Sequence, residues 1–182
     1  MNGNRKGNCI MNEAVKAIIE RRSCKAYQPE HLKKAELDVI LKAGLNAPSG
    51  RNLQPQRFVV VQNPELVKKL SRMNAAVMGV DTDPFYGAPD VIIVFSVKMG
   101  NTYLQDGSLA MGNLMNAAYG MGIGSRWIHR AKEMFENEEG RELLRTWGIT
   151  EDVVGIGCCI LGYPAEVPAP KAQVEGRVIY AD

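Results

Sequence analysis

A short segment rich in cations stands near the start of the chain. Arg21, Arg22, Ser23 and Lys25 lie within five residues of one another. Guanidinium groups match phosphate oxygens in bidentate fashion, so the cluster could bind an anion. Cations at the end of a helix also suit its dipole, and this explains one or two of them without any ligand. Both interpretations stay open on these residues alone, and Lys171 could supply a further cation.

The stretch "NAPSGRNLQPQ", residues 46–56, carries more polar groups than a connection needs. It joins an amphipathic segment to an apolar one, and a Pro and a Gly suffice for such a turn. Ser49, Asn52, Gln54 and Gln56 add hydrogen-bonding side chains. An ordinary turn does not account for them.

Composition indicates one globular domain. The chain has 182 residues, of which 46% are hydrophobic and 23% charged, enough for one substantial core. We expect residues 1–11 to be a mobile extension and 12–182 to be the domain. The net charge of +2 does not favour binding to nucleic acid, and no apolar run is long enough to span a bilayer. Because the N-terminus lacks an apolar signal core, we expect a cytoplasmic protein.

Cysteines and histidines give no support for a metal site or a nucleophilic triad. The two histidines are isolated, and the four cysteines lack the paired spacing of a zinc site. Cys158 and Cys159 are adjacent in a strand-like run, so we expect them to be buried on opposite faces. These residues are His31, His129, Cys9, Cys24, Cys158 and Cys159.

The glycines of "GMGIGS", residues 120–125, do not form a dinucleotide-binding fingerprint. The third glycine of that motif would fall on Ser125. The motif must also follow a strand and open a helix, whereas this segment follows a helical pattern. A bound nucleotide would therefore be held in another way.

Periodicity predicts an alternation of helices and strands of the α+β or mixed α/β class. The segment 103–121 is apolar nearly all round, which suggests burial at a dimer interface. Residues 74–89 are expected to be a loop, and the last apolar segment, 176–182, a short strand. The expected helices are 12–22, 34–45, 64–73, 103–121 and 138–148, and the expected central strands are 57–62, 90–97 and 153–163.

Five motifs, in order over residues 12–165, resemble the nitroreductase family of FMN-dependent oxidoreductases. They are "RRSCKAY", "APSGRNLQPQRFVVV", "FYGAPDVIIVF", "DGSLAMGNLMNAAYGMGIGSRWI" and "GYP". The resemblance implies a central, mostly antiparallel sheet flanked by helices. It also implies a homodimer with two FMN molecules in the subunit interface, and a C-terminal segment that is exchanged between the subunits.

The resemblance further implies which residues hold FMN. The cation cluster and Lys171 would bind its phosphate and ribityl chain, and the loop of the other subunit would line the ring. A polar neighbour on the long helix and a segment of backbone amides near N5 would complete the site. The implied set is Arg21, Arg22, Ser23, Lys25, Pro48, Ser49, Gly50, Asn52, Asp106, Trp127, Ile128, His129 and Lys171.

The sequence departs from the family pattern at two positions. Gln56 stands where the family often has Trp, and Gln173 stands where it often has Arg. The phosphate therefore loses one charge partner unless Arg177 replaces it.

The activity implied by the resemblance is reduction of nitroaromatic or quinone-type acceptors with NAD(P)H, by a ping-pong hydride transfer. FMN carries the chemistry, so no catalytic side chain and no metal is expected. Alternatives are a module that stores or senses FMN with little turnover, and a dehalogenating or flavin-fragmenting member of the same family.

Overall fold

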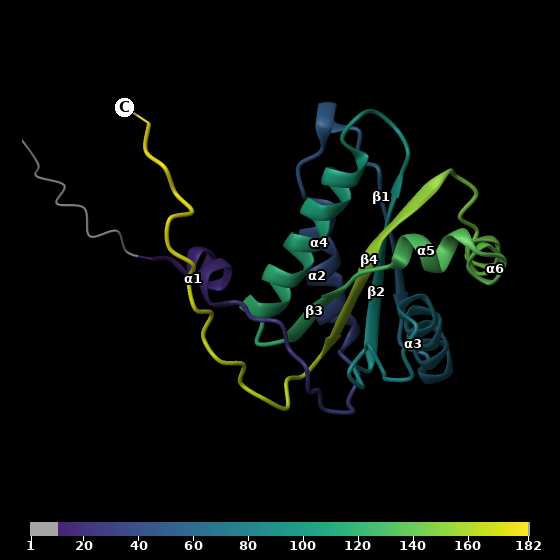
Figure 1. Cartoon of the computed structure of the whole chain (residues 1–182), viewed down its shortest axis with the longest axis horizontal. Helices are drawn as coiled ribbons and strands as arrows, with labels where there is room; N and C mark the ends of the chain where they lie inside the picture. Colours follow the sequence, from purple (N-terminus) through teal and green to yellow (C-terminus); the bar gives the residue numbers. More distant parts are fainter. Residues whose placement is uncertain (1–10, 182) are drawn as a thin grey trace, which may run out of the picture.

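The computed structural model describes residues 11–181 (Figure 1). Residues 1–10 lie outside the described residues, so the proposed extension stays a prediction. Within 11–181 the chain forms a sheet with helices on both of its faces.

The sheet has four strands in the order β1-β2-β4-β3, and every neighbouring pair is antiparallel. This arrangement confirms the expected α+β class and the antiparallel sheet. The strands are β1 (Gln56–Val61), β2 (Asp90–Val97), β3 (Gly124–Ile128) and β4 (Val153–Gly162).

The two central strands are apolar because helices cover both sides of them. Every residue of β2 is buried, as is every residue of β4 after Val153. Cys158 packs into the core on one face and Cys159 into the core on the other, as predicted. Such continuous apolar runs are expected where neither face of a strand meets water.

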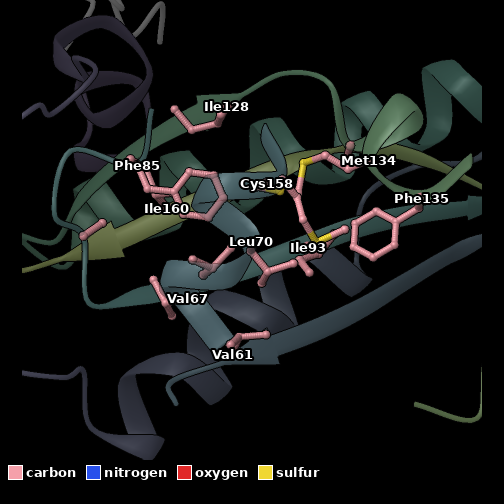
Figure 2. Packing of buried hydrophobic residues seen from close by; sticks show 14 of the residues in the cluster. Val61, Val67, Leu70, Phe85, Ile93, Ile128, Met134, Phe135, Cys158 and Ile160 are labelled. Atoms are coloured by element: carbon pink, nitrogen blue, oxygen red, sulfur yellow. The ribbon is translucent and has the colours of Figure 1, made fainter. Parts of the chain in front are cut away.

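Helices divide into two layers around the sheet (Figure 1). One face carries α3 (Pro64–Met78), α5 (Ala131–Glu136) and α6 (Glu138–Thr146). Figure 2 shows the core on this side, where Leu70, Ile93 and Phe135 meet from different elements. The other face carries α2 (Lys34–Leu45) and α4 (Tyr103–Gly120).

The first helix, α1 (Glu13–Glu20), leaves its apolar face uncovered. Ile18 and Ile19 are 62% and 53% exposed, and Ala17 is the buried residue of this helix. After β4 the chain runs past α1 as an extended segment (Figure 1). Residues of α1 and the segment's Pro164 and Val167 line one cavity. The exposed apolar side chains of α1 are therefore not covered by any residue in 11–181.

The predicted helices are present, with corrections to their extent. The predicted loop 74–89 begins too early, because α3 continues to Met78 and ends at Gly79, whose left-handed φ of 69° suits a helix C-cap. The short β3 and α5 were not predicted, since neither shows a clear period. The predicted C-terminal strand is wrong for the single chain: Val178 to Tyr180 are exposed and pair with no described strand.

Among residues 11–181, none of the helices has both the length and the apolar character needed to cross a membrane.

The two adjacent cysteine thiols of β4, Cys158 and Cys159, should not react in the native protein. Burial raises the pKa of both Cys158 and Cys159 to about 12. At pH 8 only about one thiol in 10⁴ is then ionised, and the thiolate is the reactive form. We expect iodoacetamide at pH 8 to label these residues only after unfolding in guanidinium chloride, as read by peptide mass spectrometry. Labelling of the folded protein at the rate of the unfolded chain would contradict this.

Candidate functional site

The cation cluster lies along the outer side of β3. Ser23 forms a parallel β-bridge with Ser125, and the Cys24 amide donates to the Ser125 carbonyl at 3.1 Å. The Tyr27 hydroxyl donates to the Cys24 carbonyl at 3.1 Å and fixes the end of the segment. Two predicted groups about a hundred residues apart in sequence, 21–25 and 127–129, thus come together at the same edge of the sheet.

Two arginines of the cluster carry buried donors that no acceptor among residues 11–181 satisfies. One side of Arg22 does cap α1, because its Nη1 donates to the carbonyls of Ile19 and Arg21, each at 2.8 Å. Its Nε and the Nη1 of Arg21 are buried and unpaired. Nearly all buried polar groups in folded proteins have a partner, so these donors are available to an acceptor from outside residues 11–181. Helix capping therefore explains only part of the cluster.

Strand β3 adds further donors beside the cluster. Trp127 packs on β4 at Gly157, where a Cβ atom would clash with the indole nitrogen. That nitrogen and the Ser125 hydroxyl are also buried without a partner. Ile128 is in the core, so only its backbone can face a ligand, and the imidazole of His129 is exposed.

The polar loop 48–54 is strained. Arg51, Asn52 and Gln54 have φ values of 52°, 57° and 50°, in the left-handed region that favours glycine. Each such residue costs about 1–3 kcal/mol, and clusters of them are found at functional sites. The Ser49 hydroxyl accepts from the Gln54 amide at 3.0 Å and closes the loop. The strain indicates that hydrogen bonds and packing of the loop, rather than the preference of its backbone, set its conformation.

Asp106 holds this loop from beneath. Its carboxylate is buried; Oδ1 accepts from the Gly50 amide at 3.0 Å, and Oδ2 accepts from the Thr102 hydroxyl at 3.1 Å. A Cβ at Gly50 would clash with the Thr102 hydroxyl, which explains the glycine. Asp106 therefore positions the loop; both of its oxygens already have donors.

The predicted site residues fall into two groups at opposite ends of α4. The loop 48–54 meets Asp106 near the start of the helix, and Tyr119, near its end, bonds Glu20 of α1 at 3.3 Å (Figure 1). Thirteen residues of α4 separate these two contacts, a length of about 20 Å along the axis. One chain therefore does not bring the loop to the cation cluster.

A cavity of about 410 Å³ lies beside the cluster. Arg22, Cys24, Tyr119 and Gly124 line it, together with the first residues after β4. The Lys25 amide donates to the Glu166 carboxylate at 2.9 Å, which ties that segment to the cluster. Lys171 is exposed further along and makes no side-chain hydrogen bond or ion pair with described residues.

Sequence reasoning missed Arg126, and it named Gln56 and Arg177 without their contacts. Arg126 stacks over Tyr86 at 4.8 Å, and its Nε is buried and unpaired. The only feature of the sequence that could have pointed to Arg126 is the presence of an arginine in "GSRWI". Gln56 is buried and donates to the Asp106 carbonyl at 3.4 Å, so it packs against α4. In the C-terminal segment the Arg177 guanidinium donates to the Gln173 side-chain oxygen and to the Val174 carbonyl. These hydrogen bonds link it to residues four and three positions earlier in the chain.

No cluster of three or more potential metal ligands occurs within residues 11–181.

Comparison with known proteins identifies the family. A family model described as the nitroreductase family matches residues 18–85. A protein of Archaeoglobus fulgidus is 33% identical over 161 residues, which cover 86% of this chain and 88% of the relative. The chain belongs to the nitroreductase family. That relative carries the provisional name NADH dehydrogenase/NAD(P)H nitroreductase.

Solved structures of the nitroreductase family share this fold. The FMN-bound nitroreductase of Bacteroides fragilis superposes with a TM-score of 0.85 at 27% identity, over 94% of this chain and all of that one. The FMN-bound nitroreductase of Desulfitobacterium hafniense gives a TM-score of 0.85 at 26% identity, over 95% of this chain and all of that one.

Removal of the Asp106 carboxylate should destabilise the protein. In Asp106→Ala the Gly50 amide and the Thr102 hydroxyl lose their acceptor, at a cost of about 1–3 kcal/mol. Urea titration should show a lower midpoint. Asp38→Ala, which removes an exposed pair with Lys34, is the control and should shift the free energy of unfolding by less than about 1 kcal/mol. Equal midpoints for Asp106→Ala and the unchanged protein would contradict the positioning role.

Proposed function

We propose that this protein is an FMN-dependent oxidoreductase that uses NAD(P)H to reduce nitroaromatic or quinone-type acceptors in a ping-pong cycle. The observation that carries the proposal is the set of buried, unpaired donors at the outer edge of β3. The FMN bound by two structural neighbours and the name of the Archaeoglobus relative support it.

The donors fit the phosphate end of FMN. The unpaired Nη1 of Arg21 and Nε of Arg22 are buried next to Ser23 and Lys25. A phosphate would supply the missing acceptors, and guanidinium groups hold it in a fixed orientation. Lys171 lies on the segment that Glu166 ties to the cluster, and we place it as a further phosphate partner.

The end of β3 is suited to bind the isoalloxazine ring of FMN. Backbone amides of Trp127, Ile128 and His129 are at the end of β3, beyond the bridge that Ser23 makes. Packing of the indole on Gly157 and burial of Ile128 hold this backbone rigidly. A rigid edge of donors orients a planar ring and leaves its other face open to substrates.

A second copy of the chain would complete the site. Pro48, Ser49, Gly50 and Asn52 lie at the far end of α4 from their own chain's cation cluster. In a two-fold dimer each loop can instead approach the cluster of the partner. Such a dimer would cover the exposed apolar side chains of α1, of α4 and of the extended C-terminal segment. Exchange of that segment between the subunits would bring it against the partner. The exposed side chains include Ile18, Ile19, Leu104, Leu109, Val178, Ile179 and Tyr180.

Bound FMN would supply the redox chemistry, taking two electrons from NAD(P)H and passing them to the acceptor that replaces it. The chain's own contribution is to bind, orient and exclude water. None of the described residues forms an acid–base pair at the edge of β3, where the exposed His129 is the only histidine.

The first test is colour and turnover. The purified protein should be yellow, should bleach under anaerobic NADH or NADPH, and should regain its colour when menadione or nitrofurazone is added. Arg21→Ala should weaken FMN binding by about 10- to 100-fold, since a hydrogen bond to a charged group contributes about 1.5–3 kcal/mol.

Arg145→Ala on α6 is the matched control, because that arginine pairs with surface glutamates far from the site. A colourless protein that does not bind added FMN would contradict the proposal. If FMN binds but reduction by both nicotinamides takes hours, the alternative of a storage or sensor module is right.

The dimer has its own test. Ile19→Arg places a charge in the exposed apolar face of α1 and should shift the protein towards monomer in analytical ultracentrifugation, with loss of bound FMN. Val77→Arg changes an exposed apolar residue of α3 on the opposite face and should leave the mass and the colour unchanged. An unaltered dimer in Ile19→Arg would remove α1 from the interface.

A further inference from the structure

A second and larger cavity lies away from the proposed FMN site, on the face of the sheet that carries α3. Its volume is about 780 Å³, within the range of small-molecule sites. We call it the α3 cavity; it is lined by α3 between Val67 and Ala76, by the loop 80–89 and by Pro29 and His31. It contains none of the residues proposed to hold FMN.

Two hydrogen-bonded carboxylates, those of Asp83 and Asp90, hold the walls of the α3 cavity in place. Asp83 accepts from the Ser71 hydroxyl and from the amides of Phe85 and Gly87, the latter two at 2.8 and 2.7 Å. These bonds fix the loop against α3. A cavity whose walls are tied in this way exists before a ligand arrives, so binding costs little ordering.

The opposite wall depends on Asp90. This fully buried carboxylate lies 2.7 Å from the His31 Nδ1 and accepts from the Leu32 amide at 2.6 Å and from Gln62 at 3.0 Å. His31 is therefore held with its ring at the rim of the cavity. The sequence had shown only that this histidine is isolated from other potential ligands.

The charges around the α3 cavity leave one free guanidinium. Lys68 pairs with Glu65 at 3.1 Å. Both oxygens of Asp83 are taken by the donors described above. Arg72 has no hydrogen bond or ion pair with any residue in 11–181, and the exposed Asp81 is the one acidic group at the rim without a bonded donor.

The interior is apolar. Val67, Ala75, Ala76, Val80 and Ala88 supply most of its non-polar lining. Pockets that combine an apolar body with one or two placed polar groups select ligands of the same pattern. A guanidinium is matched best by a planar or tetrahedral oxyanion such as a carboxylate or sulfonate.

We propose that the α3 cavity is a binding site for an organic acid with an aromatic or long-chain apolar body. The body lies between α3 and the loop 80–89, and the acid group bonds Arg72 at the rim. Because the cavity shares no residue with the FMN site, the proposal does not rest on the function proposed above.

Two dyes of nearly the same shape test it on the purified protein. One is 1-anilinonaphthalene-8-sulfonate, and the other is N-phenyl-1-naphthylamine, which lacks the sulfonate. Fluorescence titration should give one tight site per chain for the sulfonate. Arg72→Gln should weaken that site by about tenfold or more, the loss of a charge-assisted hydrogen bond, and should change the neutral dye by less than about twofold.

Further variants distinguish the contribution of charge to dye binding from the contribution of the apolar cavity. Asp81→Asn removes the nearby negative charge and should tighten sulfonate binding. Ala76→Trp places an indole in the cavity and should weaken both dyes; Val80→Trp serves the same purpose if the first variant does not fold. Arg141→Gln, on the exposed face of α6, is the control and should change neither.

Two results would overturn the proposal. If Arg72→Gln weakens both dyes equally or neither, the acid group is not recognised there. If both tryptophan variants leave binding unchanged, the dyes bind elsewhere. The visible spectrum of the flavin, recorded on the same samples, reports on the FMN site separately.

Discussion

The pairing of β2 with β4 is the interaction on which the rest of the structure depends. These two strands are buried on both faces, and they carry the cores that attach α3 and α5 on one side and α2 and α4 on the other. Burial of apolar side chains is the main favourable term in folding. Strand β3 joins the sheet through β4, so the backbone at 124–129 is placed by a strand about thirty residues further along the chain.

The proposed active site follows from that placement. The N-terminal segment places a cation cluster along the edge strand β3, and the donors left unpaired there are the basis for the anion site that we propose. The strained loop at the other end of α4 is held by Asp106, far from the cation cluster of its own chain. In the dimer that we propose, the loop of one subunit would meet the cation cluster of the other.

Much of this could be predicted from the sequence. The helices 34–45 and 103–120 and the strands near 57–62, 90–97 and 153–162 have clear periods, because each packs a regular face or is buried on both sides. Strand β3 could not be predicted, since Gly124, Ser125 and Arg126 carry no apolar alternation and form a strand only by pairing with β4. Tertiary pairing overrides local preference in such segments.

The site residues show the same division. Their identities came from motifs, but their roles depend on contacts that spacing does not reveal. Asp106 was expected beside the flavin, and the structure adds that its carboxylate accepts from the Gly50 amide. Gln56 was noted only as a departure from the family's Trp, and the structure shows that it packs against α4. The pairing of Arg126 with Tyr86 joins segments forty residues apart and had no signal beyond the presence of an arginine.

The central position of β4 also governs the order in which the protein can be made. This strand lies in the middle of the sheet, yet it is the last one to be synthesised. Until residues 153–162 have left the ribosome, β2 has one edge without a hydrogen-bonded neighbour and β3 has no sheet to join. An unpaired edge of a largely apolar strand is a template for aggregation. A nascent chain that stalls before Val153 therefore leaves this edge of β2 open to other chains.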